Sequence, residues 1–252
     1  MQPATVAGMN ALESLWRALP WSDWAALVFF FAAWWSYANF ARRQAPERPS
    51  VLALTNRERY RWMLQTTWRE NRVLDGVTVQ NLSASPSFFA STTILIIGGV
   101  LAVLGSTEQA NQLVQEIPFA ARSSALVFDL KLVLLLAIFI YAFFRFTWSL
   151  RQYTFGALLV AATPEFTVYA EQEALDPARG RAQREAFASR AGRVMGLAAE
   201  TFNDGLRAYY MSFAATAWFF SAWVMIAATC GVVFVLYRRE FHSDVLAVLN
   251  EA

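Results

Sequence analysis

Cysteine and histidine are almost absent from this chain of 252 residues, which holds one of each, Cys230 and His242. A single cysteine excludes a disulfide framework within the chain and argues against a metal site built on cysteine. A single histidine likewise excludes a multi-histidine metal centre within one chain. The sequence also lacks a phosphate-binding loop, a nucleophile triad and a carboxylate pair inside an apolar run. We therefore expect no enzymatic activity and no cofactor.

Charged residues are scarce as well, at 16% of the chain, whereas hydrophobic residues reach 57% and aromatic ones 15%. This composition, with a mean hydropathy of +0.33, is typical of a membrane protein. The longest apolar runs come close to the roughly 20 residues that cross a hydrocarbon core of about 30 Å. The four runs cover residues 24–41, 88–104, 125–144 and 209–237. The sequence thus predicts an all-α, polytopic membrane protein with four transmembrane helices in a single domain, residues 1–252. We expect cytoplasmic helical extensions of the third and fourth spans.

Arginine is distributed unevenly along the chain. Fifteen of the twenty arginines lie within residues 42–87 and 151–207, and each of these stretches separates two apolar runs. Lys and Arg stay mainly in cytoplasmic loops during membrane insertion, so we expect both stretches in the cytoplasm. Four crossings then leave both chain termini on the outer side. The pair Arg238 and Arg239 after the last run is the one feature that opposes this orientation.

The two arginine-rich stretches are long enough to form helices of their own. Apolar residues recur at near-helical spacing in residues 51–73 and 176–206, which predicts a cytoplasmic helical segment in each. Asp176 can cap the second helix, Pro177 suits its first position, and this helix is expected to run towards or into the fourth span. Residues 153–162 are apolar but short, which favours a re-entrant or interfacial segment over a fifth crossing.

The segment before the first span does not resemble a cleaved signal. Glu13 and Asp23 interrupt residues 1–23, and no basic region precedes an apolar core, so we expect the first span to remain as an anchor. A short helix on the outer membrane surface is predicted from the spacing of apolar residues in this segment. These residues are Met9, Leu12, Leu15, Trp16 and Leu19.

Small residues at four-residue spacing form faces on three of the predicted helices. Without bulky side chains, helix backbones approach one another closely at such faces. We interpret them as packing contacts within one subunit or, alternatively, as the seam of a homo-oligomer. The residues concerned are Gly98 and Ala102 in the second span, Ala188, Gly192 and Gly196 in the cytoplasmic helix, and Ala227 and Gly231 in the fourth span.

Three ionisable residues mark the ends of the third span. Asp129 and Lys131 lie near its outer start, and Arg145 follows its inner end. The long side chains of Lys131 and Arg145 can reach water from an interface, which explains them without a binding site. Asp129 is shorter, so it is the best single candidate for a buried polar role. Trp218 and Trp223 fall inside the fourth span, where we expect them to pack against other helices.

The predicted cytoplasmic helices carry enough arginine to form a basic vestibule. Such a surface would concentrate anions or bind anionic lipid headgroups. The positive-inside rule accounts for the same charges without any further function. Nucleic acid is not an expected partner, since no recognition fold accompanies the charge. The arginines concerned are Arg57, Arg59, Arg61, Arg69, Arg72, Arg179, Arg181, Arg184, Arg190 and Arg193.

Three segments of the chain resemble family 599 of the domains of unknown function. They run from Asn81 to Gly99, from Trp148 to Tyr153 and from Arg193 to Tyr210, and the resemblance covers nearly the whole chain. The resemblance implies a bacterial inner-membrane protein of about four spans, and the arginine distribution then puts both termini in the periplasm. It implies no activity. The chain departs from the family pattern at Thr201, where a more basic residue is expected, and at Met211, where an aromatic residue is expected.

The family motifs hold polar and aromatic residues that would lie near the cytoplasmic membrane face, Phe88 and Phe89 among them. We expect Glu200 or Asn203 to pair with Arg151, which would join the third and fourth spans. The full candidate polar network consists of Asp129, Arg145, Arg151, Tyr153, Glu200, Asn203 and Arg207.

The function that these features favour is an oligomeric, channel-like membrane protein with an anion-conducting path through an Arg-rich cytoplasmic vestibule. The alternative is a non-conducting accessory or scaffold subunit of a larger membrane complex. The expected partners are the lipid bilayer, further copies of the chain or another membrane protein, and anionic lipid.

Overall fold

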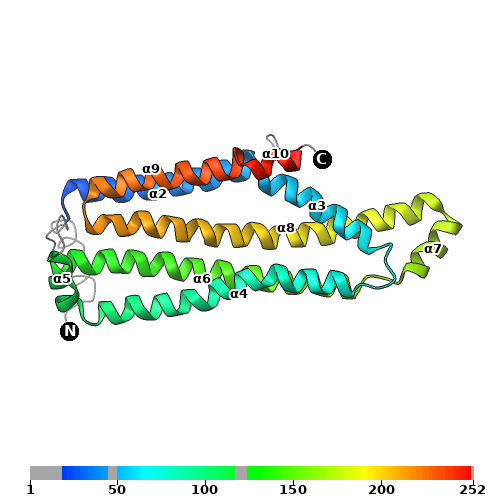
Figure 1. The fold of residues 1–252 in the computed structure, drawn as a ribbon, viewed down its shortest axis with the longest axis horizontal. Coiled ribbons are helices and arrows are strands. Elements are labelled where there is room, and N and C mark those ends of the chain that lie inside the picture. Colours follow the sequence, from blue (N-terminus) through cyan, green and yellow to red (C-terminus); the bar gives the residue numbers. More distant parts are fainter. Residues whose placement is uncertain (1–18, 45–49, 117–123, 251–252) are drawn as a thin grey trace, which may run out of the picture. The chain divides into compact units, whose positions relative to one another are not determined.

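A computed structural model describes residues 19–44, 50–116 and 124–250, and within these ranges the chain is helical without any β-strand. Residues 9–16 of the expected N-terminal surface helix lie outside the described ranges. The elements, drawn in Figure 1, are α2 (Trp21–Gln44), α3 (Val51–Thr66), α4 (Val73–Leu104), α5 (Thr107–Gln115), α6 (Ala125–Ala161), α7 (Phe166–Leu175), α8 (Pro177–Thr216), the 3-10 turn η1 (Ala217–Phe219), α9 (Ala222–Phe241) and α10 (Asp244–Asn250).

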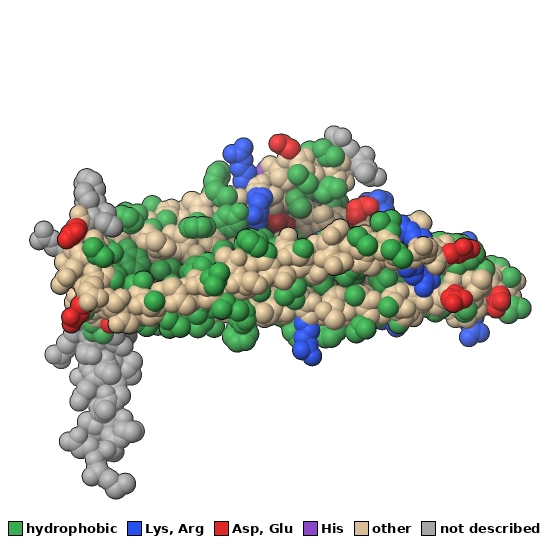
Figure 2. Space-filling view, turned by 60° about the horizontal axis from the view of Figure 1, so that its bottom comes forward, with side chains coloured by type: hydrophobic (Ala, Val, Ile, Leu, Met, Phe, Trp, Pro, Cys, Tyr) green, Lys and Arg blue, Asp and Glu red, His purple; other side chains and the backbone are tan. Residues whose placement is uncertain are grey.

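Four segments in the described part of the chain are long and apolar enough to cross a membrane. They are Trp21–Arg43, Val73–Leu104, Ala125–Ala161 and Ala222–Asn250. The most apolar windows of the first two are only 22% and 11% buried within the chain, so their side chains face outward. Figure 2 shows hydrophobic side chains exposed on the molecular surface. An outward apolar surface on fully hydrogen-bonded helices suits lipid, and the expected all-α, polytopic membrane architecture is confirmed.

The start of α8 agrees with the sequence prediction. Asp176 Oδ1 accepts hydrogen bonds from the backbone N–H groups of Ala178 and Arg179, both at 3.1 Å. Pro177 occupies the first helical position, where its missing N–H costs nothing. These bonds satisfy donors that the first turn leaves without a partner within the helix.

The helix predicted over residues 51–73 is shorter in the structure, because α3 ends at Thr66. Residues 67–72 form a turn that the side chain of Arg72 holds closed. Its Nε donates to the carbonyl oxygen of Thr66 at 3.3 Å, and its Nη1 donates to the carbonyl oxygen of Thr163 at 2.7 Å. Apolar periodicity gave no sign of this long-range contact, so it predicted too long a helix.

The fourth span also differs from the prediction, since residues 209–237 do not form one helix. α8 ends at Thr216, η1 follows, and α9 begins at Ala222. Ser221 caps α9, because its Oγ accepts a hydrogen bond from the Val224 N–H at 3.1 Å. α8 and α9 run in opposite directions on either side of this turn (Figure 1). Neither Gly nor Pro marks the turn, which explains why an uninterrupted apolar run was expected.

Residues 153–161 continue α6 as regular helix, so the re-entrant interpretation of residues 153–162 is wrong. The third span thus has the helical extension that the sequence predicted. No proline occurs between Arg145 and Ala161, and Pro164 lies just beyond the end of the helix.

The chain forms two compact units. Among the described residues, unit 1 contains residues 19–40, 95–116, 124–140 and 208–236, and unit 2 contains residues 41–44, 50–94, 141–207 and 237–250. α2, α6 and α9 begin in unit 1 and end in unit 2, whereas α4 and α8 begin in unit 2 and end in unit 1. α8 therefore contributes residues to both units, as the four apolar helices do.

Unit 1 holds the turn between α8 and α9 against the start of α2. The indole Nε1 of Trp218 donates a hydrogen bond to Asp23 Oδ1 at 2.8 Å, and Trp218 is only 2% exposed. Trp21 and Trp223 meet edge to face, with ring centroids 6.3 Å apart. Trp218 thus lies in the turn between α8 and α9, and Trp223 lies at the start of the span Ala222–Asn250, whereas the sequence placed both well inside the fourth span.

Unit 2 has a continuous apolar core between α3, α4, α6 and α8. Its buried members are Met63, Val79, Tyr153, Val160, Phe187, Ala188, Ala191, Met195 and Ala198. Phe187, Ala191 and Ala198 belong to the apolar stripe of α8, which explains why this long, otherwise polar helix docks in one orientation.

Candidate functional site

The densest group of buried charges in unit 2 surrounds Asp204 on α8. Arg207 Nη1 donates to Asp204 Oδ1 at 2.9 Å, and both side chains are only 6% exposed. Arg145 Nη2, from α6, donates to Asp204 Oδ2. Arg42 Nη1, from the last turn of α2, lies 4.0 Å from the same oxygen. We name these four residues the Asp204 cluster. Three guanidinium groups share one carboxylate in it.

The sequence brings the cluster together through three simple local features. Asp204 and Arg207 are three positions apart, which places both on one face of α8. Arg145 directly follows the apolar run 125–144, and Arg42 follows the apolar run of α2. A buried carboxylate requires charged hydrogen-bond donors, and the two nearest arginines supply them.

An aromatic cluster in unit 2 connects α4, α6 and α8. The ring centroid of Phe146 lies 5.3 Å from that of Phe89 and 5.6 Å from that of Phe202, and the centroids of Phe89 and Phe202 are 5.8 Å apart. A Cβ added at Gly205 would collide with the ring of Phe146. Phe89, a motif residue, thus has a packing role, whereas Phe88 is 66% exposed.

Arg145 and Arg207 are the members of the predicted polar network that the structure brings together. The expected pairing of Arg151 with Glu200 or Asn203 is not formed in the described part of the chain. The guanidinium of Arg151 instead lies over the ring of Phe155, 6.0 Å from its centroid. The prediction failed because Arg151 is exposed on α6, whereas Arg145 occupies the position that faces α8.

The remaining unit 2 members of the predicted network lie apart. Tyr153 is 4% exposed in the apolar core. Glu200 lines a groove of about 240 Å³ with Asn56 of α3. Asn203 lines a different groove, of about 410 Å³, beside Arg59 of α3. The two grooves are open and each holds a mixture of polar and apolar side chains.

Asp129 and Lys131 lie in unit 1 and belong to separate contacts. Asp129 is partly buried, and its Oδ1 accepts a hydrogen bond from Thr107 Oγ1 at 2.7 Å. Lys131 is only 4% exposed, and its ammonium lies 5.5 Å from the ring centroid of Trp218 and 5.6 Å from that of Phe219. The expectation that Lys131 reaches water is therefore wrong, because two aromatic faces stabilise the cation inside unit 1.

Several arginines of the expected vestibule hold unit 2 together. Arg184 is 1% exposed and lies between the rings of Trp68 and Tyr169, 3.7 and 4.6 Å from their centroids. Its Nη1 donates to the carbonyl oxygen of Thr67 at 2.5 Å. Arg69 pairs with the fully buried Asp75. These side chains are used for internal contacts and do not face an open basic surface.

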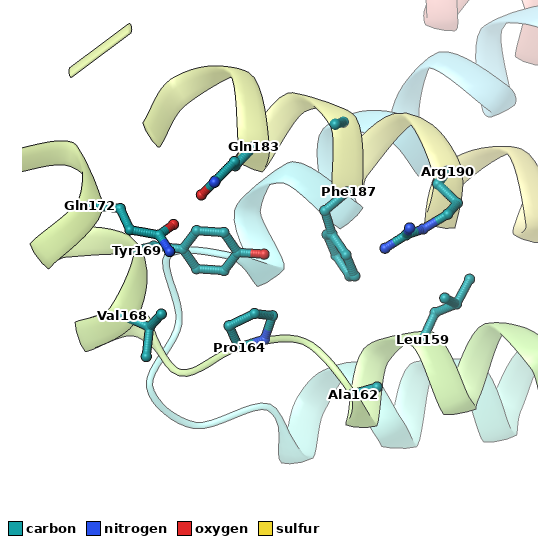
Figure 3. A pocket seen from close by; sticks show the side chains of 10 residues that line it. Leu159, Ala162, Pro164, Val168, Tyr169, Gln172, Gln183, Phe187 and Arg190 are labelled. Carbon is teal, nitrogen blue, oxygen red and sulfur yellow. The ribbon is translucent and has the colours of Figure 1, made fainter. Parts of the chain in front are cut away.

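A cavity of about 370 Å³ lies between the end of α6, α7 and the first turns of α8. Figure 3 shows the Tyr169 hydroxyl, the Phe187 ring and the Arg190 guanidinium pointing into it, with Gln172 and Gln183 at its edge. Burial raises the pKa of Tyr169 above its ordinary value, although Arg184, Arg72 and Arg190 act in the opposite direction. The lining offers hydrogen bonds and apolar contact but no nucleophile beside a base.

The small residues separate into internal and outward faces. Gly192 lies against Tyr60, since an added Cβ would be 3.0 Å from its Cα, and Gly196 would meet Asn56 Oδ1 at 2.9 Å. Ala188 is fully buried, so this face packs within the subunit. Cβ atoms added at Gly98 or Gly231 would meet nothing within 4 Å. Ala102 and Ala227, their partners at four-residue spacing, are exposed too.

The fold and the buried charge cluster define an all-helical, multi-span membrane protein with internally paired arginines. The chain belongs to the family described as protein of unknown function, DUF599, whose model matches residues 25–245. No curated protein and no solved structure matches the chain.

Sequence reasoning missed Asp204, Asp75 and the buried role of Arg184. Asp204 had a usable signal, because an Asp three positions before an Arg on a predicted helix is a common pair. Asp75 and Arg184 had none. Asp75 accepts hydrogen bonds from Trp62 and Thr66 of α3 and pairs with Arg69 of the turn that follows. The partners of Arg184 come from that turn and from α7, neither of which was predicted.

Proposed function

We propose that the protein is a self-associating, non-conducting accessory or scaffold subunit of a membrane assembly. The observation that supports this most is the outward exposure of two small-residue faces, one at Gly98 and Ala102 and one at Ala227 and Gly231. Helix backbones pack closely at such faces in lipid, where apolar side chains alone give no preference for protein over lipid. A second copy of the chain is the partner that we propose for them.

The arginines support a scaffold more than an anion vestibule. Arg69, Arg72 and Arg184 are committed to contacts that close the turn after α3 and dock α7. Guanidinium groups used in this way cannot also line a conducting path. Their proposed role is to stabilise a folded cytoplasmic layer that a partner can recognise.

Self-association is tested by native mass spectrometry of the protein in lipid nanodiscs. Gly98→Leu should reduce the oligomer fraction at least several-fold, because the added side chain keeps two backbones apart. Gly99→Leu is the matched control, since Gly99 is equally open but lies about 100° further round α4. A monomeric unmodified protein, or equal oligomer fractions in the two variants, would contradict the proposal.

A channel-like assembly is the second candidate. It is supported by exposed arginines such as Arg57, Arg179 and Arg193. Such charge attracts anions towards a path between subunits. Purified protein in planar bilayers should then carry an anion-favouring current, and no current at any voltage or ion gradient would argue strongly against it.

We further propose that the protein lies in a bacterial inner membrane with five crossings, α8 being the additional one. Every described arginine belongs to unit 2, which receives the ends of α2, α6 and α9. The last part of α8 carries Asp204 and Arg207, which lower its hydropathy, but their charges are paired and buried. Paired charges inside a bundle are tolerated at membrane depth.

The count of crossings changes the proposed orientation. Four spans predicted both termini in the periplasm, whereas five place the N-terminus in the periplasm and the C-terminus in the cytoplasm. Arg238 and Arg239, which opposed the four-span orientation, then agree with the positive-inside rule.

A further inference from the structure

The cavity between the end of α6, α7 and the first turns of α8 holds polar groups that the rest of unit 2 does not use. Its volume of about 370 Å³ is typical of a site for a small molecule. We propose that it binds a small organic acid, whose carboxylate contacts Arg190 and Tyr169 and whose apolar part contacts Phe187. The inference goes beyond the proposed self-association and does not depend on it.

The hydroxyl of Tyr169 is the first argument. Tyr169 is only 4% exposed, yet its hydroxyl points into the cavity (Figure 3) and forms no hydrogen bond with any described residue. A buried hydroxyl without a partner costs free energy, and a ligand atom that accepts its hydrogen bond removes this cost. Burial raises the pKa of the hydroxyl, although Arg184, Arg72 and Arg190 act in the opposite direction. The group is therefore protonated at neutral pH and can donate.

The charge of the lining is the second argument. Arg190 is the cation among the described lining residues, none of which is acidic. Its guanidinium points into the cavity (Figure 3) and forms neither an ion pair nor a hydrogen bond within the described part of the chain. The side-chain amides of Gln172 and Gln183 at the edge are unpaired in the same sense. A carboxylate matches this set, because one guanidinium balances its single charge in a forked geometry and neutral donors complete its hydrogen bonds.

The walls of the cavity are fixed by contacts that leave these polar groups free, which is the third argument. Arg72 Nη1 donates to the carbonyl oxygen of Thr163, just after the end of α6, at 2.7 Å. The guanidinium of Arg184 lies 4.6 Å from the ring centroid of Tyr169 and pairs with Glu173, so it holds α7 against α8. A site that is formed before the ligand arrives has little ordering cost on binding.

The rest of the lining is largely apolar, and this decides what kind of acid fits. Leu159, Pro164, Val168 and Phe187 contribute apolar surface to the cavity. An acid with an aromatic or short aliphatic group buries apolar surface against these side chains, whereas acetate has only a methyl group to bury. The proposed ligand is thus amphipathic.

The test uses the full chain in phosphatidylcholine nanodiscs, titrated with phenylpropionate, with its neutral amide and with acetate. Dissociation constants are measured by ligand-observed NMR, and empty nanodiscs correct for ligand dissolved in the lipid. Phenylpropionate should bind about tenfold more tightly than either of the others, and Arg190→Gln should remove about tenfold of this affinity, the effect of one charge-assisted hydrogen bond. Arg181→Gln is the matched control, because Arg181 is exposed on the opposite face of α8 and does not line the cavity.

Tyr169→Phe separates binding from folding. It keeps the ring beside Arg184 and removes a hydroxyl that no described residue uses. The unfolding temperature without ligand should therefore not fall, whereas the affinity for phenylpropionate should fall about tenfold.

Each outcome has a definite meaning. Saturable binding of phenylpropionate that Arg190→Gln and Tyr169→Phe weaken and Arg181→Gln does not supports the site. The proposal is overturned if phenylpropionate does not bind saturably, if the amide binds equally well, or if Tyr169→Phe leaves the affinity unchanged. Equal losses in Arg190→Gln and Arg181→Gln would overturn it too, because they would reflect the overall charge of the protein and not the cavity.

Discussion

Arg184 shows at the residue scale how this chain keeps a charge inside unit 2. The guanidinium contacts two aromatic rings, the backbone of Thr67 and the carboxylate of Glu173, whose Oε2 lies 3.4 Å from Arg184 Nε. A planar, always charged group satisfies these partners together, and a lysine ammonium would not. A single side chain thus connects α8 to α7 and to the turn after α3.

Replacing Arg184 should therefore destabilise the protein strongly. Arg184→Ala removes the donor to the Thr67 carbonyl oxygen and the ion pair with Glu173, and we expect a loss of about 3 kcal/mol in the free energy of unfolding. The measurement is thermal unfolding in detergent. Arg181→Ala, at an exposed position one turn earlier, should change the free energy by no more than about 0.5 kcal/mol. Equal effects of the two substitutions would show that the buried contacts contribute little.

Two glycines should respond in opposite ways to alanine. At Gly180 an added Cβ would lie 2.7 Å from the Cα of Glu173, so α7 would have to move, at a cost of about 1–3 kcal/mol. At Gly76 an added Cβ meets nothing within 4 Å, and Ala is the better helix former by roughly 0.5–1 kcal/mol. The unfolding temperature should thus fall for Gly180→Ala and rise for Gly76→Ala. An unchanged or raised unfolding temperature for Gly180→Ala would contradict the close approach of α7 and α8.

At the scale of elements, α8 is the helix on which unit 2 depends. Its start was predictable, because Asp176 and Pro177 form a local capping signal that no distant residue modifies. Its end was not. Residues 209–237 have the hydropathy of one long span, and only Ser221 hints at a new helix. Hydropathy reports the preference of a segment for lipid, and it cannot report where two apolar helices fold back on each other.

The candidate site was predictable in part for a similar reason. Arg145 and Arg207 stand out as charges beside apolar runs, so the sequence identified them. Their pairing through Asp204 depends on which face of α6 meets α8. The sequence is compatible with several such faces, so it does not determine the pair. The sequence therefore identified the arginines but predicted the wrong pair, Arg151 with Glu200 or Asn203, whereas Arg145 pairs with Asp204 in the structure.

The turn between α8 and α9 offers a test of its own. Trp218→Phe keeps an aromatic ring beside Lys131 but removes the N–H that Asp23 accepts, and leaves that carboxylate without its donor. We expect a loss of about 1–3 kcal/mol in the free energy of unfolding. Trp223→Phe is the control, because Trp223 is 63% exposed and its edge contact with Trp21 survives in a phenylalanine. Equal unfolding temperatures for the two variants would show that the hydrogen bond from Trp218 to Asp23 does not stabilise the turn.

At the scale of the whole molecule, the central feature is the separation of charge between the two units. All described arginines belong to unit 2, and the described cation of unit 1 is the buried Lys131. Positive-inside insertion produces such a separation only if the helices that end in unit 2 end on the cytoplasmic side. The proposed folded cytoplasmic layer depends on this orientation.

The passage of α8 through the membrane is the claim on which the rest depends, and paired topology reporters test it most directly. A fluorescent protein that folds only in the cytoplasm is fused after residue 252, and alkaline phosphatase, active only in the periplasm, is fused at residue 115. Each position is also tested with the other reporter. Five crossings predict fluorescence after residue 252 and phosphatase activity at residue 115. Phosphatase activity at both positions would mean four crossings and would contradict the account.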